Sequence, residues 1–359
     1  MKYFGVVYDV GLHFSGTDRL SVQRFDPELV KADMHGIANI MHANAVRIES
    51  EDIERLTIAS RIAHEHGLSI FFSPWKMDAG LEENKVFLRE AAIAAEQLRL
   101  EGADIVFVTG CEYTIFNDGI YPGSSIFERA SWGYDQLDRD GWPYSPEGLP
   151  SPFPEKAKEL NEVLATLVET VRESFNGPQT YSAAIFEDVD WSLFDLAGPN
   201  YYREKQTDEE YLDGLNYYKQ SGKPVAILEV GCCAYEGAAA RGSRGWRIKT
   251  GLNPDGSGIF ENGIVPTRSE REQADYIERQ LNFFAEHDVD SVFLYCFSQE
   301  DYPTGEGAWD LDMAAFGLVK MFRDDDPRSK NVPNWEPKEA FLRAGEIFQR
   351  YATANAATD

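Results

Sequence analysis

Short apolar runs, rich in β-branched and aromatic residues, alternate along the chain with longer segments in which apolar residues recur at helical spacing. The short runs predict eight strands, at residues 3–10, 45–49, 69–74, 104–110, 179–185, 193–200, 224–229 and 291–297. The longer segments predict helices at residues 27–43, 52–66, 82–101, 154–175, 208–220, 269–287 and 337–351. This alternation of strand and helix is typical of repeated βα units around a parallel sheet.

Eight strands with helical crossovers fit a closed barrel, because closure leaves no unpaired sheet edge. We therefore expect an α/β protein in which a (β/α)₈ TIM barrel occupies residues 1–359 as a single domain. An open doubly wound sheet is the alternative, but the GxGxxG turn of dinucleotide-binding sheets does not follow the first strand. Long segments rich in Gly, Pro and aromatic residues follow strands four, seven and eight, at 117–150, 232–267 and 298–337. Barrel enzymes carry their active sites on such loops.

The composition limits the classes of partner. Hydrophobic residues make up 43% and charged residues 26%, as in an ordinary globular protein, whereas the net charge of -27 repels phosphate backbones and anionic membrane surfaces. We expect neither nucleic acid nor a membrane as partner. The N-terminal residues enter a strand without a leader-like apolar stretch, and no window approaches the roughly 20 apolar residues of a membrane span, so a cytoplasmic protein is expected. The four cysteines form no CxxC pair, which predicts free thiols.

Two glutamates end buried apolar strands. Glu112 follows the fourth strand directly after Cys111, and Glu229 ends the seventh strand. A charge at the end of a buried strand is costly unless it is partnered. Strands four and seven lie across a barrel mouth from each other, so their terminal side chains can converge on one bond. Retaining glycosidases need two such carboxyl groups about 5–5.5 Å apart, one as nucleophile and one as acid/base.

Glutamates at these two positions resemble the catalytic pair of the retaining glycoside hydrolases of clan A. The resemblance implies that Glu229 is the nucleophile and Glu112 the acid/base. Arg47 on strand two is similar to the family's arginine, which holds the nucleophile ionised. Asn200 and Tyr202, after strand six, resemble the family's Asn-X-Tyr, which implies a hydrogen bond from Tyr202 to Glu229. The resemblance covers the architecture of nearly the whole chain.

Two positions depart from the family's pattern. Tyr295 to Ser298 on strand eight resembles the family's Trp-Ser stretch, which forms the floor of the sugar site, with Phe297 in the place of the tryptophan. The residue before the acid/base is usually an asparagine that binds the sugar 2-hydroxyl, whereas this chain has Cys111, whose thiol is a weak donor. The chain also looks like uncharacterised actinobacterial proteins labelled abortive infection, a label that no residue supports physically.

Further polar and aromatic residues near strand ends and loop starts are expected to line or support the site, and they are Asp9, His13, Trp75, Lys76, Tyr113 and Asn117, with Glu49 and Glu187 as additional subsite candidates. We therefore predict a retaining glycosidase that acts on a glycoside or oligosaccharide. No cofactor and no metal are expected. The sequence does not predict an oligomeric state.

Three alternatives stay open at this point. A metal-dependent sugar isomerase or epimerase on the same barrel would use an oxygen-only site, built from Asp9, Glu49, Glu112, Glu187 and Glu229. A catalytically silent carbohydrate-binding barrel is consistent with the two departures, although the pair of glutamates argues against it. A thiol nucleophile at Cys232 or Cys233 is a weaker hypothesis, because no histidine is visibly placed to activate it.

Overall fold

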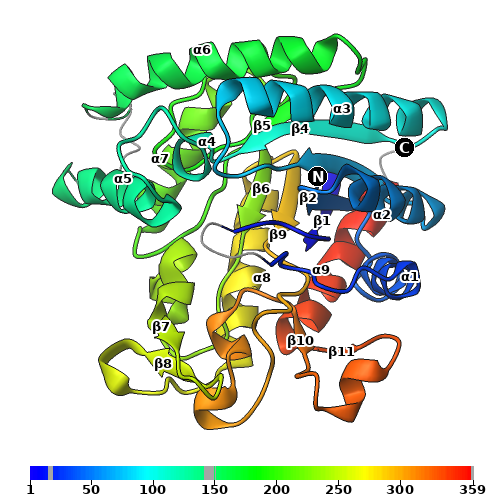
Figure 1. Cartoon of the computed structure of the whole chain (residues 1–359), viewed down its shortest axis with the longest axis vertical. Helices are drawn as coiled ribbons and strands as arrows, with labels where there is room; N and C mark the ends of the chain where they lie inside the picture. Colours follow the sequence, from blue (N-terminus) through cyan, green and yellow to red (C-terminus); the bar gives the residue numbers. More distant parts are fainter. Residues whose placement is uncertain (15–18, 141–148, 150, 357–359) are drawn as a thin grey trace.

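A parallel sheet forms the centre of the molecule in the computed structural model, which describes residues 1–14, 19–140, 149 and 151–356 (Figure 1). Its strands lie in the order β5-β4-β3-β2-β1-β9-β6. Their bounds are β1 Tyr3–Asp9, β2 Ala45–Ser50, β3 Ser69–Pro74, β4 Ile105–Cys111, β5 Gln179–Ser182, β6 Ala226–Val230 and β9 Ser291–Leu294. Residues 141–148 and 150 of the first predicted long loop lie outside the described part of the chain.

Residues 197–200 complete the barrel between β5 and β6. Single parallel bridges join Pro199 to Ala183 on one side, and Ala197 and Asn200 to the β6 side of the barrel on the other. Gly198 permits this close approach, because a Cβ there would lie 2.4 Å from the carbonyl oxygen of Tyr181. The predicted (β/α)₈ barrel is therefore confirmed, with β6 as its seventh strand and β9 as its eighth. The predicted sixth strand began too early, since Trp191–Leu193 forms a 3₁₀ turn (η2).

The long helices cover the outside of the barrel (Figure 1). They are α1 Pro27–His35, α2 Ile53–Glu65, α3 Leu81–Leu100, α6 Phe153–Arg172, α7 Asp208–Lys219, α8 Glu270–Glu286 and α9 Glu339–Ala356. Side chains cap several of them: Thr207 and Glu210 form a reciprocal capping box on α7, and Ser269 caps α8. The predicted helix 27–43 is shorter, because a π-helical turn, η1 Gly36–Ile40, replaces its end.

The loops at the carboxyl ends of the strands carry short elements of their own. These are α4 Tyr113–Phe116, α5 Ile126–Asp140, the hairpins of β7 Lys249–Leu252 with β8 Gly258–Phe260 and of β10 Val319–Met321 with β11 Trp335–Pro337, and the 3₁₀ turns η3 Ala238–Ala240, η4 Gly242–Ile248, η5 Glu261–Gly263, η6 Gly307–Trp309, η7 Asp312–Ala314 and η8 Pro327–Lys330. No helix within the described residues is both long and apolar enough to cross a bilayer.

Aromatic rings fill the amino-terminal half of the barrel interior. The ring of Phe71 lies 4.4 Å from that of Phe293 and 5.4 Å from that of Tyr3, and all three side chains are buried. Truncating one such ring to alanine costs about 3–5 kcal/mol. Because alternate residues of a strand share a face, Arg47 and Glu49 of β2 point into the same interior nearer the mouth.

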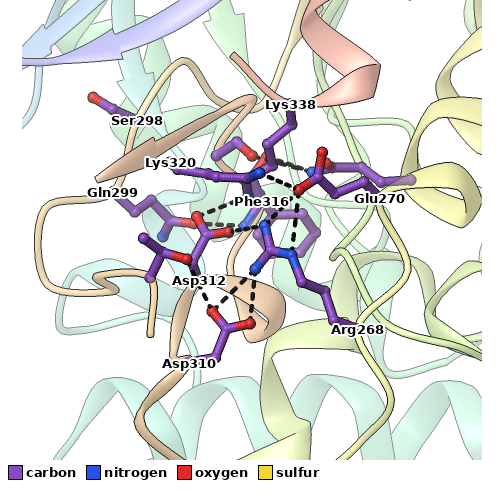
Figure 2. Close-up of polar contacts among 12 residues, drawn as sticks. Arg268, Glu270, Ser298, Gln299, Asp310, Asp312, Phe316, Lys320 and Lys338 are labelled. Carbon is purple, nitrogen blue, oxygen red and sulfur yellow. Dashed lines mark hydrogen bonds and ion pairs between the residues drawn. The ribbon is translucent and has the colours of Figure 1, made fainter. Parts of the chain in front are cut away.

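A network of charged side chains, here called the loop clasp, joins the long loops that follow β6 and β9 (Figure 2). Arg268 binds Asp310 at 2.9 Å and Asp312 at 2.8 Å, and it also reaches Glu270 at the start of α8. Lys320 and Lys338 add ion pairs to Glu270 and Asp312, so three cations meet three anions. The clasp is thus electrically balanced and holds these loops over the barrel mouth.

Candidate active site

Glu229 lies at the carboxyl end of β6, and its carboxylate is bound on both oxygens. Arg47 donates from Nη1 to Oε1 at 3.1 Å, and the Tyr202 hydroxyl donates to Oε2 at 3.1 Å. The thiol of Cys111 also approaches Oε1, at 3.6 Å. A cation and a hydroxyl on opposite oxygens stabilise the ionised form and fix the side-chain rotamer.

Arg47 is fully buried and joins Glu229 to a second carboxyl group, that of Glu49. Burial raises the pKa of Glu49, Arg47 opposes this rise, and the charge of Glu229 adds to it. The resulting pKa is about 8. Glu49 is predicted only as a subsite residue or a metal ligand, and its pairing with Arg47 is not predicted. The pairing could have been predicted from the sequence, because residues two apart on a strand point to the same face.

Glu112 lies one residue beyond β4 with left-handed backbone angles, φ 41° and ψ 50°. That conformation costs a non-glycine residue about 1–2 kcal/mol. Its carboxyl oxygen Oε1 accepts a hydrogen bond from Asn200 Nδ2 at 2.9 Å, and Ser182 donates to the other end of that amide at 2.7 Å. Burial, and then the repulsion of Glu229, raise the pKa of Glu112 to about 8.

Glu187 anchors the strained turn that carries Glu112. Its carboxylate accepts hydrogen bonds from the backbone N–H and hydroxyl of Thr114, from the Tyr181 hydroxyl and from the Ala184 N–H, at 2.7–3.0 Å. These donors occupy both oxygens, and the side chain is buried. The prediction that Glu187 belongs to an oxygen-only metal site or a sugar subsite is therefore wrong, because its bonding capacity serves the fold.

Tyr113 and Asn117 also support the loop rather than the carboxylates. Asn117 Oδ1 accepts from the Ala79 N–H at 3.2 Å and from Asn84 at 3.3 Å. The Tyr113 side chain is buried and hydrogen-bonds Asn84 as well. Both residues thus hold α4, which follows Glu112, against the start of α3.

The candidate residues after strands one and three, which are Asp9, His13, Trp75 and Lys76, have three different settings. Asp9 is partly buried, and burial raises the pKa of its carboxyl to about 6, although the Gly11 N–H donates to it at 2.7 Å. Lys76 forms an ion pair with Glu51 at 3.0 Å, and His13 hydrogen-bonds the same carboxylate at 3.1 Å, at the rim of the site. Trp75 is buried edge-on against Phe116.

The indole N–H of Trp75 has no hydrogen-bond partner among the described residues. Trp75 extends the alternation of β3, since its own backbone N–H bonds the carbonyl of Ser50 on β2. It therefore shares the inner face with Phe71 and Ser73. An unpaired donor at this position is available to a ligand hydroxyl.

Strand eight differs from the prediction. Phe297 is fully buried against Tyr8, Trp335 and Phe341, between the barrel and α9, so the prediction that it forms the floor of a sugar site is wrong. The regular strand ends at Leu294, and the alternation of faces does not extend to Phe297. Tyr295, which follows the strand directly, is the aromatic residue on the site side, because the carboxylates of Glu49 and Glu229 act on its hydroxyl.

Two rings from the long loops lie near the carboxylates, Tyr134 in a loop whose aromatic residues are predicted to face the mouth, and Phe316, which no sequence pattern indicates. Phe316 packs between Tyr202 and Tyr295, at 5.9 and 5.7 Å, and its backbone N–H is held by Gln299 beside the loop clasp (Figure 2). Tyr134 of α5 lies near Glu112, whose charge, after burial, raises the Tyr134 pKa to about 12. Both come from long loops, where the sequence gives no register to align them with strand ends.

Glu49, Cys111 and Glu229 offer atoms within 4.8 Å of one another, which is compatible with a metal site. The guanidinium of Arg47 already contacts both carboxylates of this cluster. A divalent ion there would be repelled by that buried cation, so the residues fit an ion-pair cluster better than a metal centre. Cys232 and Cys233 are fully buried, and burial raises the pKa of each thiol, which disfavours either as a nucleophile.

The fold is shared with solved glycoside hydrolases. A GH113 β-1,4-mannanase structure matches with a TM-score of 0.59 at 15% identity, over 97% of this chain and 99% of that one. A GH113 β-mannanase from Alicyclobacillus acidocaldarius matches with a TM-score of 0.53 at 15% identity, over 98% of each chain. A β-glucosidase matches with a TM-score of 0.58 at 12% identity, over 98% of each chain.

No protein-family model and no curated protein sequence matches the chain. At these identities the likeness extends to the fold alone. The predicted resemblance to the barrel glycosidases is confirmed at that level: the chain is a single (β/α)₈ barrel of the kind found in glycoside hydrolases.

Proposed function

We propose that the protein is a retaining glycoside hydrolase in which Glu229 is the nucleophile and Glu112 the acid/base. One observation carries the proposal: Glu229 is held on both carboxylate oxygens by Arg47 and Tyr202, while the facing Glu112 has a pKa of about 8. A fixed anion opposite a protonated acid is the pairing that double displacement requires.

The reaction follows from these two environments. Glu112 gives its proton to the glycosidic oxygen while a carboxylate oxygen of Glu229 attacks the anomeric carbon, so that the leaving group departs as an alcohol. Glu112 then takes a proton from a water molecule, whose oxygen displaces Glu229 from the same carbon. The two inversions together retain the anomeric configuration.

We infer a β-glycoside as the substrate class. The solved structures that share the fold include β-mannanases, a β-glucosidase and a β-D-glucuronidase from Dictyoglomus thermophilum. The rings of Tyr134 and Tyr295 near the carboxylates suit the apolar faces of a pyranose. Aryl β-mannosides, β-glucosides, β-galactosides and β-glucuronides form the first panel to assay.

The nucleophile is tested with Glu229→Gln, assayed on the best substrate of that panel beside a Glu101→Gln control, whose carboxylate lies on the surface paired with Arg61. We expect Glu229→Gln to lose at least a thousandfold in kcat and the control to keep full activity. A 2-deoxy-2-fluoro glycoside should label Glu229 covalently, which a sugar-binding barrel without catalysis would not allow. Near-normal turnover by Glu229→Gln would exclude the assigned role.

The metal-dependent isomerase is separated by the same assays. A chelator should leave the hydrolysis rate unchanged, because no step of the proposed reaction uses an ion. Loss of activity in chelator with recovery on adding a divalent ion would favour the isomerase instead.

A further inference from the structure

The side-chain amide of Asn200 lies beside the proposed catalytic carboxyl groups and has donor capacity to spare. Its nitrogen carries two hydrogens, and one of them is given to Glu112 Oε1 at 2.9 Å. The other recorded acceptor is the sulfur of Cys111 at 4.0 Å, the outer limit of a hydrogen bond to sulfur. The second N–H is therefore only weakly used.

The fold fixes the direction in which this amide points. Asn200 bridges Glu229 in the barrel ladder, and only 1% of the residue is exposed. The hydroxyl of Ser182 donates to Oδ1 at 2.7 Å, which leaves the amino end facing Glu112 and Cys111. Rotation of the amide would break two buried hydrogen bonds, so the donor is preorganised.

The weakly used N–H points toward Cys111, which in turn contacts the proposed nucleophile. Cys111 touches Glu229 Oε1 at 3.6 Å and Asn200 Nδ2 at 4.0 Å, and so links the amide to the nucleophile oxygen. The anomeric carbon of a substrate must lie between Glu112 and Glu229, and its neighbouring carbon C2 carries the nearest hydroxyl. That hydroxyl is the substrate group best placed to meet an amide that binds Glu112 and points its second hydrogen toward Cys111.

Cys111 does not compete for this hydroxyl. Burial and the charge of Glu229 raise the pKa of its thiol well above the ordinary value, so the sulfur keeps its proton and directs it to Glu229. A thiol is also a weak hydrogen-bond donor. The strong neutral donor beside the C2 position is therefore the Asn200 amide.

We propose that Asn200 is a specificity-determining residue, which donates one hydrogen to the 2-hydroxyl of the donor sugar and the other to Glu112. The proposal rests on the proposed glycosidase function. It implies that the protein selects sugars with a free 2-hydroxyl, although the residue directly before Glu112 is a cysteine. Sugars that lack this hydroxyl, or carry a substituent on it, should be poor substrates.

The test uses Asn200→Ala with two substrates, the best aryl β-glycoside of the panel and its 2-deoxy counterpart. We expect kcat/KM for the 2-hydroxy substrate to fall by roughly tenfold more than kcat/KM for the 2-deoxy substrate, the factor that one neutral hydrogen bond carries. Asn161→Ala is the matched control, since Asn161 makes two hydrogen bonds to residues 188 and 190, away from the carboxyl groups. It should leave the ratio of the two substrates unchanged.

The pH profile gives a second readout. Because the Asn200 bond lowers the pKa of Glu112, its loss should move the alkaline limb of the rate profile to higher pH. Ser182→Ala leaves the amide in place but unfixed, so it should shift the substrate ratio in the same direction by a smaller factor. If Asn200→Ala does not fold, Ser182→Ala allows the same comparison of the two substrates.

The outcomes separate the two proposals. Equal losses on both substrates, with an unmoved pH profile, would overturn the role of Asn200 while wild-type turnover and labelling of Glu229 still support the glycosidase. A wild type that neither hydrolyses the panel nor is labelled would refute the glycosidase, and the role of Asn200 with it.

Discussion

Removing the hydroxyl of Tyr202 tests whether the nucleophile depends on being held at both oxygens. Tyr202→Phe keeps the ring, which packs 5.9 Å from Phe316, and removes only the donor to Glu229 Oε2. Arg47 and Cys111 both act on the other oxygen, so Oε2 loses its donor from within the described residues. The carboxylate then becomes free to rotate about its terminal bond.

The size of the effect follows from the charge on the acceptor. A hydrogen bond to a charged group contributes about 1.5–3 kcal/mol. Because about 1.4 kcal/mol corresponds to a tenfold change in rate, kcat/KM on an activated aryl β-glycoside should fall by roughly 10- to 150-fold. The loss should appear mainly in kcat, since the Tyr202 hydroxyl orients the nucleophile rather than the bound sugar.

The neighbouring Tyr201 provides the matched control. Its hydroxyl donates to the carbonyl of Tyr211 on the outer side of the barrel, in a setting that is equally buried. Tyr201→Phe should therefore lower the free energy of unfolding by about as much as Tyr202→Phe, about 1–3 kcal/mol, but leave kcat/KM nearly unchanged. Equal activity in the two variants, with equal stability, would refute the role assigned to Tyr202.

Three further predictions concern protonation and the loops. Because burial raises the pKa of Glu112 from its ordinary 4.5 to about 8, the folded state binds the proton more tightly; kcat/KM for a poor leaving group should fall as pH rises through about 8. The free energy of unfolding should fall as pH rises from about 4.5 to 8. Glu112→Gln should reduce this dependence on pH in denaturation curves measured at several pH values. Arg268→Met should cost about 3–5 kcal/mol by leaving the buried carboxylate of Asp310 without the cation that binds it, whereas Arg61→Met on the surface should cost less than about 1 kcal/mol, both measured by urea titration. Glu187→Ala should remove the anchor of the Glu112 turn and cost about 2–4 kcal/mol by the same measurement, and unchanged stability would mean that the turn holds itself.

Strand periodicity predicted the barrel and the parts of the site that the barrel positions. Arg47, Tyr202 and Glu229 meet because each lies at or just after a strand of a closed parallel sheet, and all strands of such a sheet end at one mouth. The same reasoning would have paired Arg47 with Glu49. Periodicity therefore predicted that these side chains share one mouth, whereas the roles proposed for them came from the resemblance to the barrel glycosidases.

The loop residues could not be placed in this way. Glu187 and Asn117 were candidates because they follow strands, but their partners, Thr114 and Asn84, lie in segments whose path depends on packing and not on register. Phe297 failed for a related reason, since it lies beyond the last regular residue of β9. Sequence pattern determines which way a side chain points only while the strand continues.

Glu229 and Glu112 have different partners because Glu229 lies inside its strand, whereas Glu112 lies one residue beyond the end of its strand. Glu229 lies within the ladder of β6, so its side chain is directed into the barrel, where the guanidinium on the inner face of β2 meets it. Glu112 lies one residue past the end of β4, and its left-handed turn carries the carboxyl away from that cation to a single neutral amide. Two carboxyl groups of the same intrinsic acidity thereby have different partners, and this difference is the basis of the separate roles proposed for them.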